Sequence, residues 1–128
     1  MSDHATTDTR EIIVEILLSL EKGQDFSHKL MKAVLDKYDY LDPREKAFIK
    51  RVTEGTIERQ LELDYYLDRF SSVPVRKMKP LIRCLLRMST YQILYMDAVP
   101  DSAVCNEACK LAAKSLPYPE RLRQCGAA

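Results

Sequence analysis

The fold is decided by residues 78–114, which read MKPLIRCLLRMSTYQILYMDAVPDSAVCNEACKLAAK. From about Pro80 to Met96, apolar residues recur every three or four positions, which predicts an amphipathic helix. These residues are Leu81, Ile82, Leu85, Leu86, Ile93 and Leu94. The next residues, Val99-Pro100-Asp101-Ser102, form a turn with a helix cap, so a second helix is predicted from Ala103 to about Ser115. The stretch therefore predicts two helices joined by a tight turn.

Two segments near the N-terminus show the same helical period. The first is rich in isoleucine and leucine and would be capped by Thr7 or Asp8. Gly23 is expected to end it, because glycine readily adopts the left-handed conformation that follows many helices. A second amphipathic run begins after Ser27, which is another capping residue type. Both segments are predicted to be helices.

The clearest helix start in the chain is Asp42-Pro43-Arg44-Glu45. It places Asp at the cap, Pro at the first helical position and Glu at the third. The helical pattern then continues to Phe70, and a run of about 28 residues is long for one globular helix, so a break or kink is expected near Gly55. The residues Ser71-Ser72-Val73-Pro74 are predicted to be a linker.

The composition is that of a globular helical domain. The chain has 128 residues, of which 46% are hydrophobic and 30% are charged, and only 3 are glycines. No stretch approaches the roughly 18 consecutive apolar residues of a membrane span, and the N-terminus lacks the apolar part of a signal peptide, so a cytoplasmic location is expected. The predicted class is all-α, with a first bundle at about 8–70, a second at about 74–115, and a truncated or disordered tail over 116–128.

Charge is unevenly distributed along the chain. Residues 1–68 hold 10 Lys/Arg and 15 Asp/Glu, whereas residues 69–128 hold 10 Lys/Arg and 4 Asp/Glu. The basic second half indicates an acidic partner, for which nucleic acid is the first candidate. The predicted RNA-binding residues are Arg76, Lys77, Lys79 and Arg83. On a helix, residues 76, 79, 83 and 87 would line one stripe. A solvated basic face, or a protein–protein interaction module whose basic face meets an acidic protein, remains an alternative.

Several polar and aromatic residues are assigned structural roles. Arg87 is predicted to be internal and to pair with Glu107 of the following helix. Cys105 and Cys109 have the spacing of two metal ligands, but no further ligand is spaced to complete a site, so both are expected to be small buried groups. The chain carries no metal, nucleotide or nucleophile motif, and no catalytic residue or metal site is predicted. Most of four tyrosines are expected to lie in the core: Tyr65, Tyr66, Tyr91 and Tyr95.

Several short elements carry a resemblance to a known family. In the second half they are Leu86-Arg87, Tyr91-Gln92, Val99-Pro100 and Asn106-Glu107-Ala108. In the first half they are Asp42-Pro43-Arg44, Gly55-Thr56 and Leu63-Asp64. With these elements, roughly residues 8–115 resemble the NusB-like domain, most closely the N-terminal domain of the RsmB/Sun family of 16S rRNA cytosine-5 methyltransferases. The domain is predicted to span residues 1–115. The resemblance implies an all-helical RNA-binding fold, in which Arg10 stands where antitermination factors carry an arginine-rich stretch and so joins the RNA-binding candidates.

The resemblance also implies what the chain does. It implies an RNA-binding accessory domain that positions a methyltransferase on ribosomal RNA. The catalytic cysteines and S-adenosylmethionine belong to a downstream module, so this chain is expected to have no enzyme activity and no cofactor of its own. The alternative within the family is a stand-alone NusB-type transcription antitermination factor. Nothing after Lys114 matches the closing helix of the family. Without that helix, apolar residues of the two helices predicted over 80–96 and 103–115 would be exposed. A homodimer through the C-terminal half is therefore expected to cover them.

Overall fold

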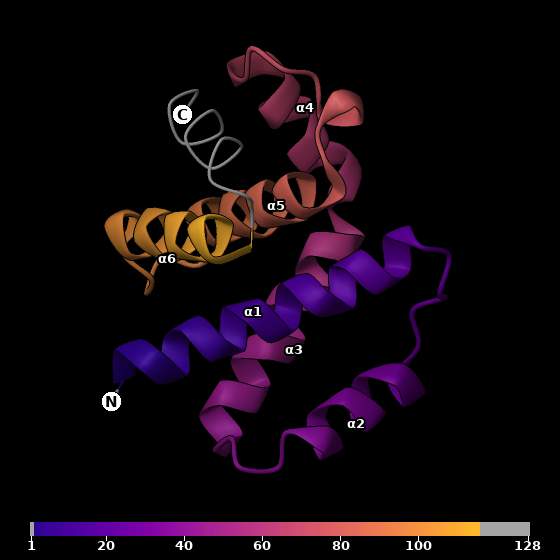
Figure 1. The fold of residues 1–128 in the computed structure, drawn as a ribbon, viewed down its shortest axis with the longest axis vertical. Coiled ribbons are helices and arrows are strands. Elements are labelled where there is room, and N and C mark those ends of the chain that lie inside the picture. The colour runs from indigo at the N-terminus through magenta and orange to yellow at the C-terminus, as the bar shows by residue number, and fades with distance from the viewer. Residues whose placement is uncertain (1, 116–128) are drawn as a thin grey trace.

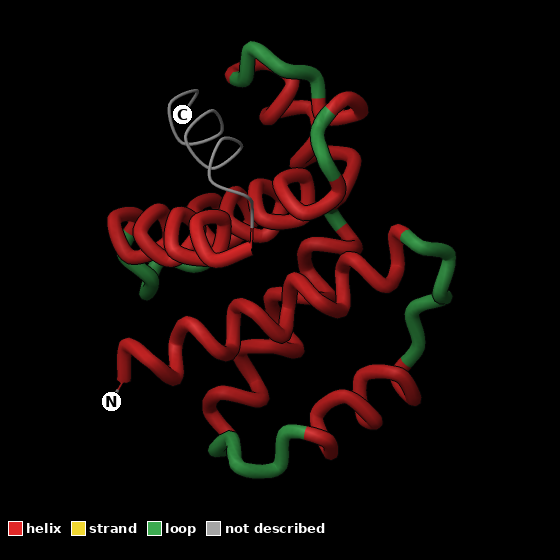
Figure 2. Tube along the Cα trace, viewed as in Figure 1, coloured by secondary structure: helices red, strands yellow, loops and turns green. Residues whose placement is uncertain are grey.

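The computed structural model describes the backbone of residues 2–115 and the side chains of residues 9–114. The predicted tail over 116–128 lies outside the described residues. The elements are α1 Ser2–Glu21, α2 His28–Lys37, α3 Pro43–Glu58, α4 Gln60–Phe70, the 3₁₀ turn η1 Val75–Lys77, α5 Pro80–Tyr95 and α6 Asp101–Ser115. The described part of the chain contains no strand, which confirms the all-α class (Figure 2).

Helix α5 lies at the centre of the arrangement. It packs against α1, α3, α4 and α6, and α1 also packs against α3 and α6. Figure 1 shows α5 and α6 side by side, α1 crossing below them, and α2 held at the edge between two loops. The buried apolar residues form one continuous cluster, from Ile13 in α1 through Ile49 in α3 and Leu63 in α4 to Met88 in α5. The predicted division into two bundles stays a prediction, and the segments on either side of residue 72 share this core.

The first two helices largely follow their predicted signals. Helix α1 begins at Ser2 and not after a cap at Thr7 or Asp8, so the expected start was wrong. Gly23 ends the helix as predicted: its φ is 104°, its N–H donates to the Leu20 carbonyl, and the next N–H donates to the Ser19 carbonyl. This pair of bonds is a Schellman motif, which satisfies carbonyls that the helix end leaves free. Helix α2 is capped by Ser27, whose hydroxyl accepts from the Leu30 N–H at 3.1 Å.

The predicted long helix is divided at Arg59 and not at Gly55. Its start is confirmed, because Asp42 and Glu45 form a reciprocal capping box. Gly55 lies inside α3, fully packed, and a Cβ at this position would overlap the ring of Tyr91 on α5. The glycine is therefore required by the close approach of two helices, and the break expected near it is wrong.

This contact predicts the effect of Gly55→Ala. In an ordinary helical position, alanine is more favourable than glycine by about 1 kcal/mol. At position 55 the added methyl group must displace a ring that is packed in the core, so we expect a net loss of about 1–3 kcal/mol in the free energy of unfolding. Urea denaturation measures the change.

The matched control is Ala33→Gly at an exposed position of α2. Helix propensity acts alone there, so the glycine variant is the less stable one. If Gly55→Ala stabilises the protein, the ring of Tyr91 does not pack as described.

Candidate nucleic-acid interface

A basic segment, residues 76–79, crosses from α4 to α5. Two buried side chains hold it against the core, Val75 at 4% and Met78 at 8% exposure. The carboxylate of Asp68, in the last turn of α4, accepts from the Val75 N–H at 2.8 Å and fixes the start of η1. The side chains between and after these anchors, Arg76, Lys77 and Lys79, are exposed. Within the described residues, Arg76 and Lys77 form no ion pair.

Arg83 does not share this exposure. Its guanidinium binds both carboxylate oxygens of Glu21, at 2.7 and 2.8 Å, and donates to the backbone carbonyls of Val75 and Met78. The side chain is only 16% exposed. The predicted stripe is wrong, because residues 76–79 form a 3₁₀ turn and an extended cap before α5 and do not continue its helix. Arg83 is bonded to Glu21 and to two backbone carbonyls, so it is not available to a phosphate in this structure.

Arg87 is internal as predicted, but its partner is not Glu107. Its Nε and Nη2 bind the two oxygens of Asp64 on α4 at 2.7 and 2.8 Å, and Nη1 reaches Glu21 at 3.2 Å. Glu107 is buried on α6, which packs against α1 and α5. Two arginines and two carboxylates thus join α1, α4 and α5, and we call this set the charged network: Glu21, Asp64, Arg83 and Arg87.

Arg10 is also placed inside the molecule, at 3% exposure. It donates from Nε and Nη2 to the side-chain oxygen of Gln92, at 3.1 and 2.8 Å, and lies over the ring of Phe48. Burial lowers the pKa of this guanidinium, and the negative charge of Glu107 opposes the shift. Glu107 thus acts on Arg10, and the expected RNA contact of Arg10 is replaced by a role in the core.

A cleft of about 700 Å³ opens beside the charged network. Its lining comes from the end of α1 and the loop that follows it, and from α3, α4, η1 and α5, and it includes Arg76. Hydrogen bonding from Arg83 lowers the pKa of Glu21, and burial raises the pKa of Cys84 to about 12, which keeps that thiol protonated. No group of His, Cys, Asp or Glu in the described residues is arranged to hold a metal ion. The cleft wall is charged, and its arginines other than Arg76 are engaged internally.

Two expectations about buried side chains were wrong. Cys105 and Cys109 are exposed on α6 rather than buried. Tyr65 is 57% exposed and Tyr66 is 37% exposed on α4. The other two tyrosines are packed as expected, with their rings stacked at 5.3 Å, and are Tyr91 and Tyr95. Periodicity alone missed the exposed pair, because the spacing of the tyrosines does not show which face of α4 packs against the core.

The fold and this surface define an all-helical domain with a basic segment exposed beside a charged cleft. The chain belongs to the NusB family, whose profile matches residues 7–120. The predicted resemblance is confirmed. No helix in the described part of the chain is long and apolar enough to cross a membrane.

Relatives of two kinds are similar to this chain. A probable ribosomal RNA small subunit methyltransferase B of Bacillus subtilis is 36% identical over 106 residues, which is 83% of this chain and 23% of that protein. Its counterpart in Synechocystis is 27% identical over 103 residues, with 80% and 23% covered. A transcription antitermination protein NusB of Acetivibrio thermocellus is 27% identical over 105 residues, with 81% and 72% covered. The chain thus spans about a quarter of the methyltransferases it matches. No solved structure matches the chain.

The charged network predicts a cost for Asp64→Asn. The change removes a charge from a pair whose arginine is 11% exposed and whose aspartate is 23% exposed. We expect a loss between the roughly 1 kcal/mol of an exposed pair and the about 3–5 kcal/mol of a fully buried one. The control is Asp36→Asn, which breaks an exposed pair with Lys32 and should cost less than about 0.5 kcal/mol. Equal melting temperatures for the two variants would contradict the internal placement of Arg87.

The same network predicts a pH dependence of stability. The pKa of Glu21 is lower in the folded protein than its ordinary value of 4.5, chiefly because Arg83 binds it. A lowered pKa in the folded state stabilises the protein above the unfolded pKa, and this contribution is lost as the pH falls below 4.5 toward the lowered value. We expect Glu21→Gln to reduce the slope of stability against pH in this acidic range. An unchanged slope would show that Glu21 is not held by Arg83.

Proposed function

We propose that this domain binds RNA and positions a 16S rRNA (cytosine-5) methyltransferase on ribosomal RNA. The observation that carries the proposal is the basic segment, where Arg76, Lys77 and Lys79 are exposed on a fixed turn. Phosphate groups are bound chiefly by exposed Lys and Arg side chains. The similarity to ribosomal RNA small subunit methyltransferase B supports ribosomal RNA as the target.

The mechanism of such a domain is electrostatic and geometric. The charged network and the Asp68 bond hold η1 against α4 and α5, so its cations keep their relative positions before RNA arrives. Phosphate contacts of this kind fix where a protein sits on RNA but carry little sequence information. The target cytosine would be selected and methylated by a separate module, which would also bind S-adenosylmethionine.

A second candidate function is supported by the similarity to antitermination proteins. The chain is 27% identical over 105 residues to the transcription antitermination protein NusB of Acetivibrio thermocellus. An antitermination factor would bind a linear transcript element together with a ribosomal protein. Comparing a folded small-subunit rRNA fragment with a linear leader transcript separates the two functions, and we expect the tighter binding to the rRNA fragment.

The test of RNA binding is the double substitution Arg76→Glu with Lys77→Glu. Filter binding to a small-subunit rRNA fragment is measured over a range of salt concentrations. We expect weaker binding at low salt, and a salt dependence whose logarithmic slope falls by about 2, since two phosphate contacts are removed. Circular dichroism should show unchanged helicity, because both side chains are exposed.

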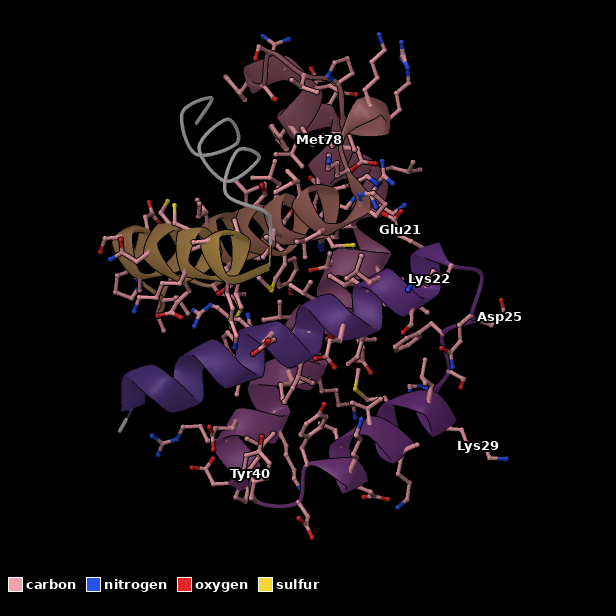
Figure 3. All side chains as sticks on the ribbon, viewed as in Figure 1. Glu21, Lys22, Asp25, Lys29, Tyr40 and Met78 are labelled. Carbon is pink, nitrogen blue, oxygen red and sulfur yellow. The ribbon has the colours of Figure 1, made fainter. Side chains whose placement is uncertain are left out.

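The matched control reverses two exposed charges elsewhere, with Lys29→Glu on α2 and Arg44→Glu at the start of α3. In Figure 3, Lys29 lies well away from Met78 of the basic segment. The control has the same net charge as the test variant and should bind nearly as tightly as the wild type. Equal loss in both variants would mean that net charge alone governs binding, and that the basic segment is not the RNA surface.

A further inference from the structure

Helix α4 exposes large side chains that the core does not use. Its inner face carries Leu63, which is fully buried, whereas its outer face and end leave four apolar or aromatic residues in solvent. These are Leu61 at 86%, Tyr65 at 57%, Tyr66 at 37% and Phe70 at 81% exposure. Single exposed apolar residues are common, but several on one short helix indicate a binding surface.

Two of these rings and one cation form a connected group. The rings of Tyr65 and Tyr66 meet edge to face with centroids 5.5 Å apart. The guanidinium of Arg69 lies 6.0 Å from the centroid of Tyr65. Unpaired RNA bases stack on tyrosine rings and on the planar faces of arginine. The ring of Tyr65 and the guanidinium of Arg69 therefore form a surface on which an RNA base can stack.

The charges around this group favour an anionic partner. Each of the three carboxylates of α4 is bonded within the protein: Glu62 accepts from the hydroxyl of Tyr95, Asp64 binds Arg87, and Asp68 accepts from the Val75 N–H. The cations nearby are exposed instead, on Arg69 and on the basic segment. A purely apolar partner would have to cover these cations, whereas an RNA strand would pair with them through its phosphates.

The tyrosines lie on α4, the helix that packs against η1 and so against the start of the basic segment. Asp68, which binds the start of η1, is three residues beyond Tyr65, or about 4.5 Å along the helix axis. We propose that Tyr65 and Arg69 stack against an unpaired base of an RNA strand whose phosphates bind Arg76 and Lys77. This inference rests on the proposed RNA-binding function and assigns the contact to unpaired segments of the RNA, such as the loops of a folded rRNA fragment, rather than to a duplex.

The test compares single-stranded and duplex RNA of roughly 12 nucleotides by fluorescence anisotropy. Replacing Tyr65 by leucine keeps an apolar side chain but removes the ring. Since base stacking on one aromatic residue is worth a factor of about 5 to 100 in affinity, we expect Tyr65→Leu to weaken single-strand binding by that amount. Tyr65→Phe keeps the ring and should bind within about twofold of the wild type by the same reasoning. Duplex binding should change little, because paired bases are not free to stack.

The matched control is Tyr40→Leu. Tyr40 is also exposed and also pairs edge to face with a neighbouring tyrosine, Tyr38, but it lies at the other end of the molecule (Figure 3). Unchanged single-strand affinity for Tyr65→Leu, or an equal loss with duplex RNA, would overturn the stacking role alone. A wild-type chain that binds neither RNA would overturn the proposed function as well, so the two failures are distinguishable.

Discussion

The guanidinium of Arg87 is the point on which the charged side of the structure depends. It binds Asp64 of α4 with two hydrogen bonds and reaches Glu21 at the end of α1, so one side chain on α5 fixes two other helices. Arginine suits this position because its planar fork matches a carboxylate with two parallel bonds. Arg83 repeats the arrangement one turn earlier on the same carboxylate of Glu21. The orientation of α4, and with it the place of η1, follows from these bonds.

The basic residues therefore fall into two groups, one bound within the protein and one exposed to solvent. Arg10, Arg83 and Arg87 are enclosed and bind protein groups, whereas Arg76 and Lys77 face solvent. The excess positive charge of the second half therefore overstates the charge available to a ligand. The enclosed arginines still affect the exposed ones, because Arg83 donates to the two carbonyls that bracket η1. Arg83 would not itself contact RNA, but its hydrogen bonds help to hold the backbone of the basic segment that would.

The sequence predicts those features that depend on neighbouring residues and misses those that depend on distant ones. The caps at Ser27 and Asp42, the end at Gly23 and the extent of α5 are local, and all were predicted correctly. The partner of Arg87 was wrong, because Asp64 and Glu107 are both acidic residues on helices that pack against α5, and only the helix orientations choose between them. Tyrosine spacing likewise cannot show which face of α4 is exposed.

The contact between Gly55 and Tyr91 has a consequence for how this domain can change over evolution. The ring of Tyr91 occupies the space that any side chain at position 55 would need. A larger residue at one position is tolerated only with a smaller residue at the other, so the two positions are constrained to vary as a pair. The two positions are far apart in the chain but in contact where α3 packs against α5. Correlated substitutions at positions 55 and 91 among related sequences would therefore indicate that the two helices pack together at this point.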